Sequence, residues 1–352
     1  MQFVRLAKLG LIAGLASLAA LGAFETVQAR PKPPPVIEAP PPPPPMPEVS
    51  LARHFVADAG AFDDYMHQAA SISPAFADAG AVGQSLRAAA AYEPGQLRAG
   101  MVAYGAIAAL TDNAFVADVR RAGATPEARY AIVTKIFTDP KAALAFADSG
   151  RAAGLAKQAI VTDAMRLYDQ GNAVKLAAYS IQHQPWSLQT VPDLDTRGDA
   201  VKRLSSTQRS VPGSELQTLD FMIAGQPTTP FEPAPPRYSA LVVRAVALAA
   251  LASIGQATDE DAPRLGWLTD DYYVEHCLAE AKLSLFECLA VARPNYEDVF
   301  CLGQHAMKDT GGCTVIGAGG AVPIDIVVKP LAIPSPHAGR TSTAAHHRRR
   351  TR

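Results

Sequence analysis

The residues whose types and spacing could do chemistry are gathered in the C-terminal third of the chain. The four cysteines of the 352 residues are Cys277, Cys288, Cys301 and Cys313. Among them stand Asp298, His305 and Asp309, whose side chains are of the kind that moves protons or binds metals. Such a cluster could bind a metal ion, form a thiol-redox centre or close two disulfides.

The cysteine spacing favours two nested disulfides. We expect a helix over Asp271–Ala292, which ends before Pro294 because the residue before a proline avoids the helical conformation. We expect a second helix over Pro294–Asp309, because proline is common at the first helical position and the glycines Gly311-Gly312 end helices. Cys277 and Cys288 are then about 16.5 Å apart along one helix, too far for a disulfide, whose Cα atoms lie roughly 4.4–6.8 Å apart. In an antiparallel hairpin, residues that are equally far from the turn lie opposite one another. The pairs Cys288–Cys301 and Cys277–Cys313 are both centred near Pro294. The crossed alternative, Cys277–Cys301 with Cys288–Cys313, has no common centre.

Metal and redox sites fit these residues less well. A zinc ion could use Cys301, His305, Cys313 and Cys277, but paired CxxC spacings are missing. CxxCH, which a covalent haem needs, and CxxC, which a thiol-redox site needs, are also missing. We therefore predict structural disulfides, and no metal or cofactor.

The second helix of the hairpin is the one candidate for catalysis. At helical spacing Asp298, Cys301, Leu302, His305 and Asp309 share a face, so Asp298 or Asp309 could orient His305 as a general base. The alternative, a surface histidine beside a carboxylate, is favoured. The motifs GxSxG, HExxH and the P-loop are absent from the sequence.

The N-terminus predicts export. Arg5 and Lys8 precede an uncharged run over 9–24, and Val27-Gln28-Ala29 is a small-x-small site, so residues 1–29 form a signal peptide cleaved after Ala29. The alternative is retention as a membrane anchor. Either way the folded part lies outside the cytoplasm, in the periplasm of a Gram-negative-type envelope or secreted.

The two ends of the remaining chain have biased compositions. Residues 30–49 hold eleven prolines and predict an extended spacer, or else a proline-rich ligand. For residues 321–352 we expect an extended segment that ends in a flexible basic tail with five arginines. The formal charge is −1 for the whole chain, and about −7 when the signal peptide and these arginines are left out. We expect the tail to bind an anionic envelope surface or another envelope protein, and no nucleic acid.

The body between the ends is predicted to be all-α. It is rich in alanine, poor in aromatic residues and follows helical periodicity, so we expect an irregular multi-helix array. A proline-rich connection over 185–237 separates an N-terminal helical domain, 50–184, from a C-terminal one, 238–320. The expected helices are 51–70, 74–92, 95–110, 114–122, 126–137, 140–147, 151–183, 199–206, 214–224 and 238–255.

Two classes of function stay open on this evidence. The first is a non-enzymatic envelope scaffold or protein-interaction module. This protein would be attached to the membrane only if the signal segment is retained. The second is an exported hydrolase, directed at the cell wall, that uses His305 with Asp298 or Asp309. The two differ in whether these side chains converge in a concave pocket.

Overall fold

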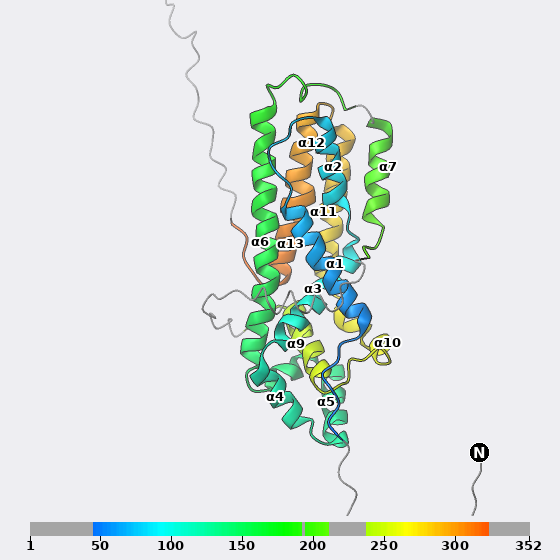
Figure 1. Cartoon of the computed structure of the whole chain (residues 1–352), viewed down its shortest axis with the longest axis vertical. Coiled ribbons are helices and arrows are strands. Elements are labelled where there is room, and N and C mark those ends of the chain that lie inside the picture. Colours follow the sequence, from blue (N-terminus) through cyan, green and yellow to red (C-terminus); the bar gives the residue numbers. More distant parts are fainter. Residues whose placement is uncertain (1–44, 192–193, 211–236, 324–352) are drawn as a thin grey trace, which may run out of the picture. The chain divides into compact units, whose positions relative to one another are not determined.

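The computed structural model describes residues 45–191, 194–210 and 237–323, and these residues form helices and loops without a strand (Figure 1). The all-α prediction is confirmed. The expected signal peptide, most of the proline-rich spacer, the expected helix 214–224 and the basic tail lie outside the described residues.

The helices of the described residues follow the predicted periodicity closely. In chain order they are α1 (Arg53–Ala70), α2 (Ala79–Ala90), α3 (Pro94–Leu110), α4 (Asn113–Ala122), α5 (Pro126–Thr138), the 3₁₀ helix η1 (Pro140–Ala145), α6 (Ser149–Ile181), α7 (Leu194–Ser205), α9 (Ala240–Ser253), α10 (Ala262–Leu265), the 3₁₀ helix η2 (Gly266–Thr269), α11 (Tyr272–Val291), α12 (Asn295–Cys301), the π-helical segment η3 (Leu302–Asp309) and α13 (Thr310–Gly317).

Helices from both expected domains share one hydrophobic core. α9 is buried along nearly its whole length and packs against α3, which in turn packs against α1 and α6. Gly100 lets α3 approach α1, because a Cβ there would lie 2.4 Å from the carbonyl oxygen of Asp58. This shared core makes residues 45–191 and 237–323 parts of one packed body.

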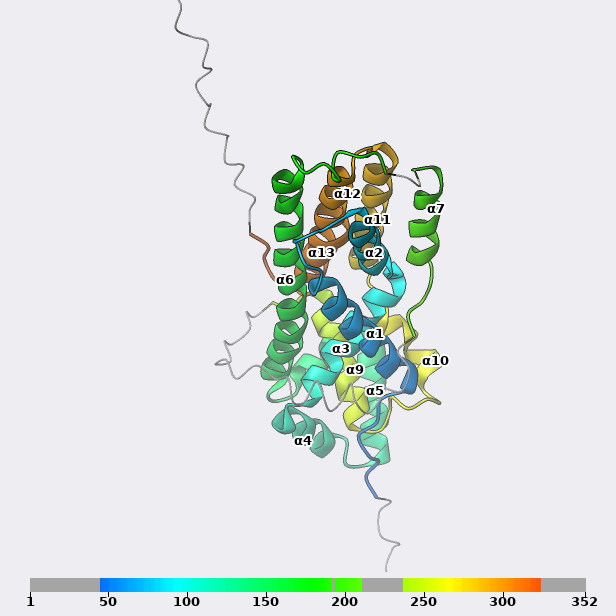
Figure 2. The ribbon, with the colours of Figure 1, turned by 45° about the horizontal axis from the view of Figure 1, so that its top comes forward.

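The C-terminal helices form a layer that carries the cysteines. α12, η3 and α13 follow one another without a break from Asn295 to Gly317, antiparallel to α11. This stretch lies between α6 and α11 and packs against both (Figure 2). Its inner side faces α1 and α2, since the hydroxyl of Tyr65 donates a hydrogen bond to the Ala306 carbonyl, at 3.3 Å.

Several elements differ from the sequence prediction. α7 begins at Leu194 rather than at the expected residue 199. α2 begins at Ala79, not at the expected Pro74, because Asp78 caps it by accepting a 2.8 Å hydrogen bond from the Ala81 N–H. The segment expected as a helix over 140–147 is a short 3₁₀ helix. The last helix continues through Gly311 to Gly317, because that glycine permits close packing rather than ending the helix: a Cβ there would lie 2.7 Å from the Tyr168 nitrogen.

α7 is attached to the body mainly by polar contacts. It packs against α11 and α2, at the side of the layer away from α6 (Figure 1). Val201 is its one buried apolar side chain among the residues whose exposure the structure gives. Arg209, just after its end, exchanges hydrogen bonds with Gln96 at 2.7 and 2.8 Å.

Candidate functional site

Two disulfides join the C-terminal helices, as the cysteine spacing predicts. Cys277 bonds Cys313, and Cys288 bonds Cys301, each pair with a Cα–Cα distance of 5.7 Å. No free cysteine remains. Both bonds link α11 to the stretch from α12 to α13, so they lock the hairpin at two levels.

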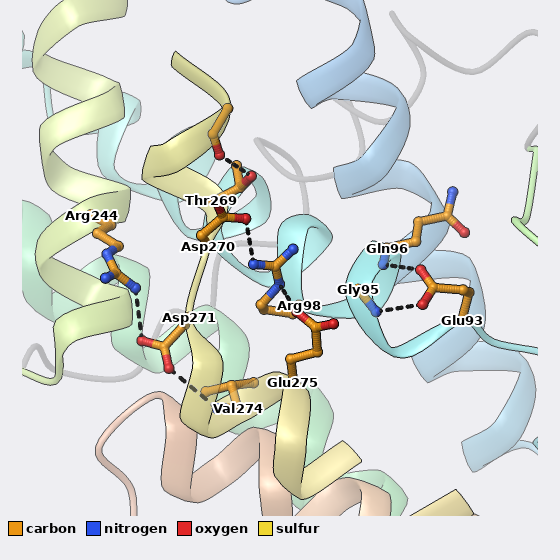
Figure 3. Close-up of polar contacts among 11 residues, drawn as sticks. Glu93, Gly95, Gln96, Arg98, Arg244, Thr269, Asp270, Asp271, Val274 and Glu275 are labelled. Atoms are coloured by element: carbon orange, nitrogen blue, oxygen red, sulfur yellow. Dashed lines mark hydrogen bonds and ion pairs between the residues drawn. The ribbon is translucent and has the colours of Figure 1, made fainter. Parts of the chain in front are cut away.

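The first turn of α11 is fixed by two arginines from other helices (Figure 3). Arg98 of α3 bonds Asp270 at 2.6 Å and lies 3.4 Å from Glu275. Arg244 of α9 bonds Asp271 at 3.0 Å, and Asp271 also caps α11 by accepting from the Val274 N–H. The outer disulfide, one turn further along, therefore starts from a rigid base.

The segment between the disulfides is π-helical. η3 runs from Leu302 to Asp309. Such π-helical segments are rare in proteins, and those that occur are often found at functional sites. It sits unusually close to α6: a Cβ on Gly303 would lie 2.2 Å from the Lys175 nitrogen, and one on Gly171 would lie 2.4 Å from the Lys308 nitrogen. Backbone contact on this side, and disulfides on the other, hold η3 in place.

The structure brings His305 and Asp309 together. The Nδ1 of His305 lies 2.8 Å from the Asp309 Oδ2, and Gln304 donates a 2.7 Å hydrogen bond to the other oxygen of that carboxylate. The His305 side chain is 22% exposed. No hydroxyl or thiol among the described residues hydrogen-bonds to this ring, so the pair has no bonded nucleophile.

Asp298 belongs to a different contact. It lies 3% exposed on the side of α12 that faces α7, where Arg197 donates to its two carboxylate oxygens at 2.7 and 2.5 Å. The same guanidinium donates to the carbonyls of Leu289 and Ala292 at the end of α11. Burial raises the Asp298 pKa to about 6, against the opposing effect of Arg197. Asp298 is thus a structural anchor for α7, and of the two expected carboxylates Asp309 alone orients His305.

Two cavities lie on the outward side of the layer. The first, of about 450 Å³, is next to the outer disulfide, and its lining includes Tyr168, Glu280, Ser284, Gln304, Lys308 and Asp309. The second, of about 360 Å³, is next to the inner disulfide, and its lining includes Tyr179, Val291, Tyr296, Glu297 and Phe300. Both are bounded by α6, α11 and the stretch between them. We call the two cavities and the outward face of α12 and η3 between them the outer groove.

The rim of the outer groove is apolar and acidic. Tyr179, Val291 and Ile316 are 55%, 72% and 58% exposed, and the Tyr179 ring meets Phe300 edge-on at 6.3 Å. Three carboxylates line the cavities, those of Glu280, Glu297 and Asp309. The one lysine of the lining, Lys308, is 3% exposed with its Nζ 5.2 Å from the centre of the Tyr168 ring.

A buried lysine on the inner side of α11 was missed by the sequence analysis. The Nζ of Lys282 donates to the Ala90 carbonyl, lies 3.1 Å from the Ser205 hydroxyl and sits 3.5 Å from the centre of the Tyr92 ring. Burial lowers the Lys282 pKa well below its usual range. The signal was present: residue 282 falls in the apolar stripe of α11 with Leu278 and Leu285, where a charged residue is unusual.

Other kinds of site are not formed by the described residues. They contain no group of three or more His, Cys, Asp or Glu side chains arranged to hold a metal ion. No single helix among them is long and apolar enough to cross a membrane, and α3 with α4 reach that length only across an 89° bend. No known protein family, characterised protein or solved structure showed a significant similarity to the chain.

Proposed function

We propose that this protein is an exported envelope scaffold or interaction module that binds a partner protein through the outer groove. The observation that carries the proposal is the groove itself: two cavities under exposed apolar side chains, over a floor that two disulfides and a backbone contact make rigid. Rigid surfaces bind with little loss of conformational entropy, which favours affinity.

The disulfides and the N-terminal sequence support the proposed compartment. Disulfides persist where the environment is oxidising, such as the periplasm or the cell exterior. The charged, apolar and small-x-small regions of residues 1–29 support export with cleavage after Ala29. We place the mature protein in the periplasm of a Gram-negative-type envelope.

The chemistry of the groove indicates what the partner presents. The cavity beside Tyr179 and Phe300 accepts a large apolar or aromatic side chain, which is the usual anchor of a protein interface. The carboxylates of Glu280, Glu297 and Asp309 favour lysine or arginine beside that anchor. The partner segment is therefore apolar and basic.

Site-specific photocrosslinking tests this proposal. The photoreactive residue p-benzoylphenylalanine is placed at Val291 on the groove rim or, as a matched control, at Tyr130, which is 75% exposed on α5. Each chain is irradiated in envelope extract of the native host. We expect a discrete protein adduct from position 291 and none from position 130. Adducts from both positions, or from neither, would refute the groove as the binding surface.

One observation supports the hydrolase as a second candidate. The 2.8 Å contact between His305 and Asp309 is the geometry by which a carboxylate orients a catalytic histidine. Purified protein is incubated with cell-wall polymer, and released fragments are measured for the wild type, His305→Gln and the control His183→Gln, an exposed residue just after the end of α6. Release that His305→Gln alone abolishes would establish the hydrolase; no release from the wild type would exclude it for that polymer.

The basic tail is proposed to bind an anionic surface of the envelope. Its five arginines lie outside the described residues. Co-sedimentation with vesicles that contain anionic phospholipid compares the mature chain with a chain truncated after residue 339. We expect binding by the mature chain only, decreasing as salt is raised, because screening weakens contacts between exposed charges.

A further inference from the structure

We propose that residues 324–329 of the chain itself, Ile-Asp-Ile-Val-Val-Lys, occupy the outer groove and compete with the partner. This inference rests on the proposed function, since it names what regulates the same surface. It begins from the last described residues. Val322 and Pro323 already line the larger cavity, so the chain enters the groove before the described part ends.

A hydrogen bond fixes the point of entry. The Tyr168 hydroxyl of α6 donates to the Pro323 carbonyl at 3.2 Å. The ideal Cβ position of Gly312 in α13 lies 3.9 Å from a methyl carbon of Val322, which places that valine against the floor of the groove. The segment that follows therefore starts between α6 and α13, within the groove.

The segment is long enough to reach the second cavity. Tyr168 lines the larger cavity and Tyr179 the smaller one. Eleven residues of α6 separate them, a rise of about 16.5 Å at 1.5 Å per residue. Six residues of extended chain span up to about 20 Å. Residues 324–329 can thus reach from Pro323 to the cavity beside the inner disulfide.

The order of residues suits an extended chain lying on an apolar floor. In such a chain alternate side chains point to opposite sides. Ile324, Ile326 and Val328 would face the groove, and Asp325 would face solvent. The exposed side chains that they would cover include Tyr179 and Val291, whose burial is favourable.

The tether also favours this occupant. Residues 324–329 have no net charge, since Asp325 offsets Lys329, and their apolar side chains match the exposed apolar rim of the groove. Because the segment is tethered at Pro323, it competes at a high effective concentration.

The test uses the full mature chain with p-benzoylphenylalanine in place of Val291, purified and irradiated without a partner. Peptide mapping is done on an equimolar mixture of ¹⁵N-labelled and unlabelled chains. We expect adducts between position 291 and residues 324–334, with both peptides carrying the same isotope. Adducts of mixed isotope would show a second copy in the groove and overturn the intramolecular contact, as would adducts with no peptide of this segment.

Substitutions in the segment provide matched variants. Ile326→Asp with Val328→Asp is expected to reduce the adduct at least fivefold, whereas Val327→Asp, on the opposite side of the extended chain, leaves it within twofold. Truncation after Pro323 is expected to increase capture of the partner about fivefold or more. If truncation leaves partner capture unchanged while position 291 still crosslinks to the partner, this inference fails and the proposed function stands.

Discussion

Gly171 of α6 and Gly303 of η3 meet backbone to backbone. A Cβ added to Gly171 would lie 2.9 Å from the Gly303 carbonyl oxygen, and one added to Gly303 would lie 2.8 Å from the Gly171 carbonyl oxygen. Neither position has space for a side chain. This contact fixes the π-helical floor of the outer groove against its longest wall, on the side opposite the disulfides.

Gly303→Ala is therefore expected to destabilise the fold. Its Cβ would lie 2.2 Å from the Lys175 nitrogen, so α6 and η3 must separate, at a cost of about 1–3 kcal/mol for overpacking. The matched control is Gly198→Ala on α7, where nothing lies within 4 Å and the free energy of unfolding should change little or rise by about 0.5–1 kcal/mol. Urea unfolding measures both, and equal effects would show that the glycine contact is unimportant.

The two disulfides should contribute unequally to stability. In the loop-entropy model the stabilisation grows with the length of the closed loop, which is 36 residues for the outer bond and 13 for the inner. Replacing Cys277 and Cys313 by alanine should cost about 4 kcal/mol, and replacing Cys288 and Cys301 about 3 kcal/mol. Denaturant unfolding of the two double variants checks the order. A larger loss from the inner pair would contradict the loop-entropy explanation.

The buried Lys282 should make stability depend on pH. Because burial lowers its pKa, the unfolded chain binds a proton that the folded chain does not, at any pH between the lowered value and the ordinary one near 10.4. Folding stability therefore rises with pH in that window, by up to about 1.4 kcal/mol per pH unit. Lys282→Met removes this dependence.

Urea unfolding at pH 7, 8 and 9 measures the effect of Lys282→Met. The free energy of unfolding of the wild type should increase relative to the variant as the pH rises. Lys202→Met, at an exposed position of α7, is the control and should follow the wild type. Parallel pH profiles for the wild type and Lys282→Met would show that Lys282 keeps its proton in the folded state.

Arg197 is expected to hold α7 on the body. Arg197→Ala leaves the buried Asp298 carboxylate without its partner, and breaking a buried ion pair typically costs about 3–5 kcal/mol. Release of α7 would let water reach Asp298 and limit this loss. We therefore expect faster amide hydrogen exchange across Leu194–Ser205, measured by mass spectrometry.

Two variants make the Arg197 prediction specific. Arg203→Ala removes an exposed arginine of the same helix and should leave exchange unchanged. Adding Asp298→Asn to Arg197→Ala should slow exchange again, because no buried charge remains. If Arg203→Ala speeds exchange as much as Arg197→Ala, the ion pair is not what holds α7.

The hairpin and its disulfides could be predicted because their geometry is local. Helical rise excludes a bond between Cys277 and Cys288, and Pro294 fixes the turn about which the other cysteines pair. The helices upstream follow from alanine content and periodicity in the same way. None of this requires contacts between distant parts of the chain.

What could not be predicted depends on such distant contacts. The partner of Asp298 is Arg197, 101 residues away. Glycine is typical of a helix end, but Gly311 packs closely against Tyr168 of α6 and lies inside a helix. The π-helical turn between Leu302 and Asp309 likewise has no sequence pattern of its own, and it separates His305 from Asp298, which regular helical spacing would place on the same face.

The outer groove is proposed to bind the partner, and the affinity for the protein identified in the Val291 adduct tests this proposal directly. Tyr179 is 55% exposed at the groove rim, and Tyr130 is 75% exposed on α5, so either can be truncated with little effect on the fold. We predict that Tyr179→Ala weakens binding about 30-fold, the loss of an interface hot spot, and that Tyr130→Ala changes it less than twofold. Equal affinities for the two variants would contradict the account.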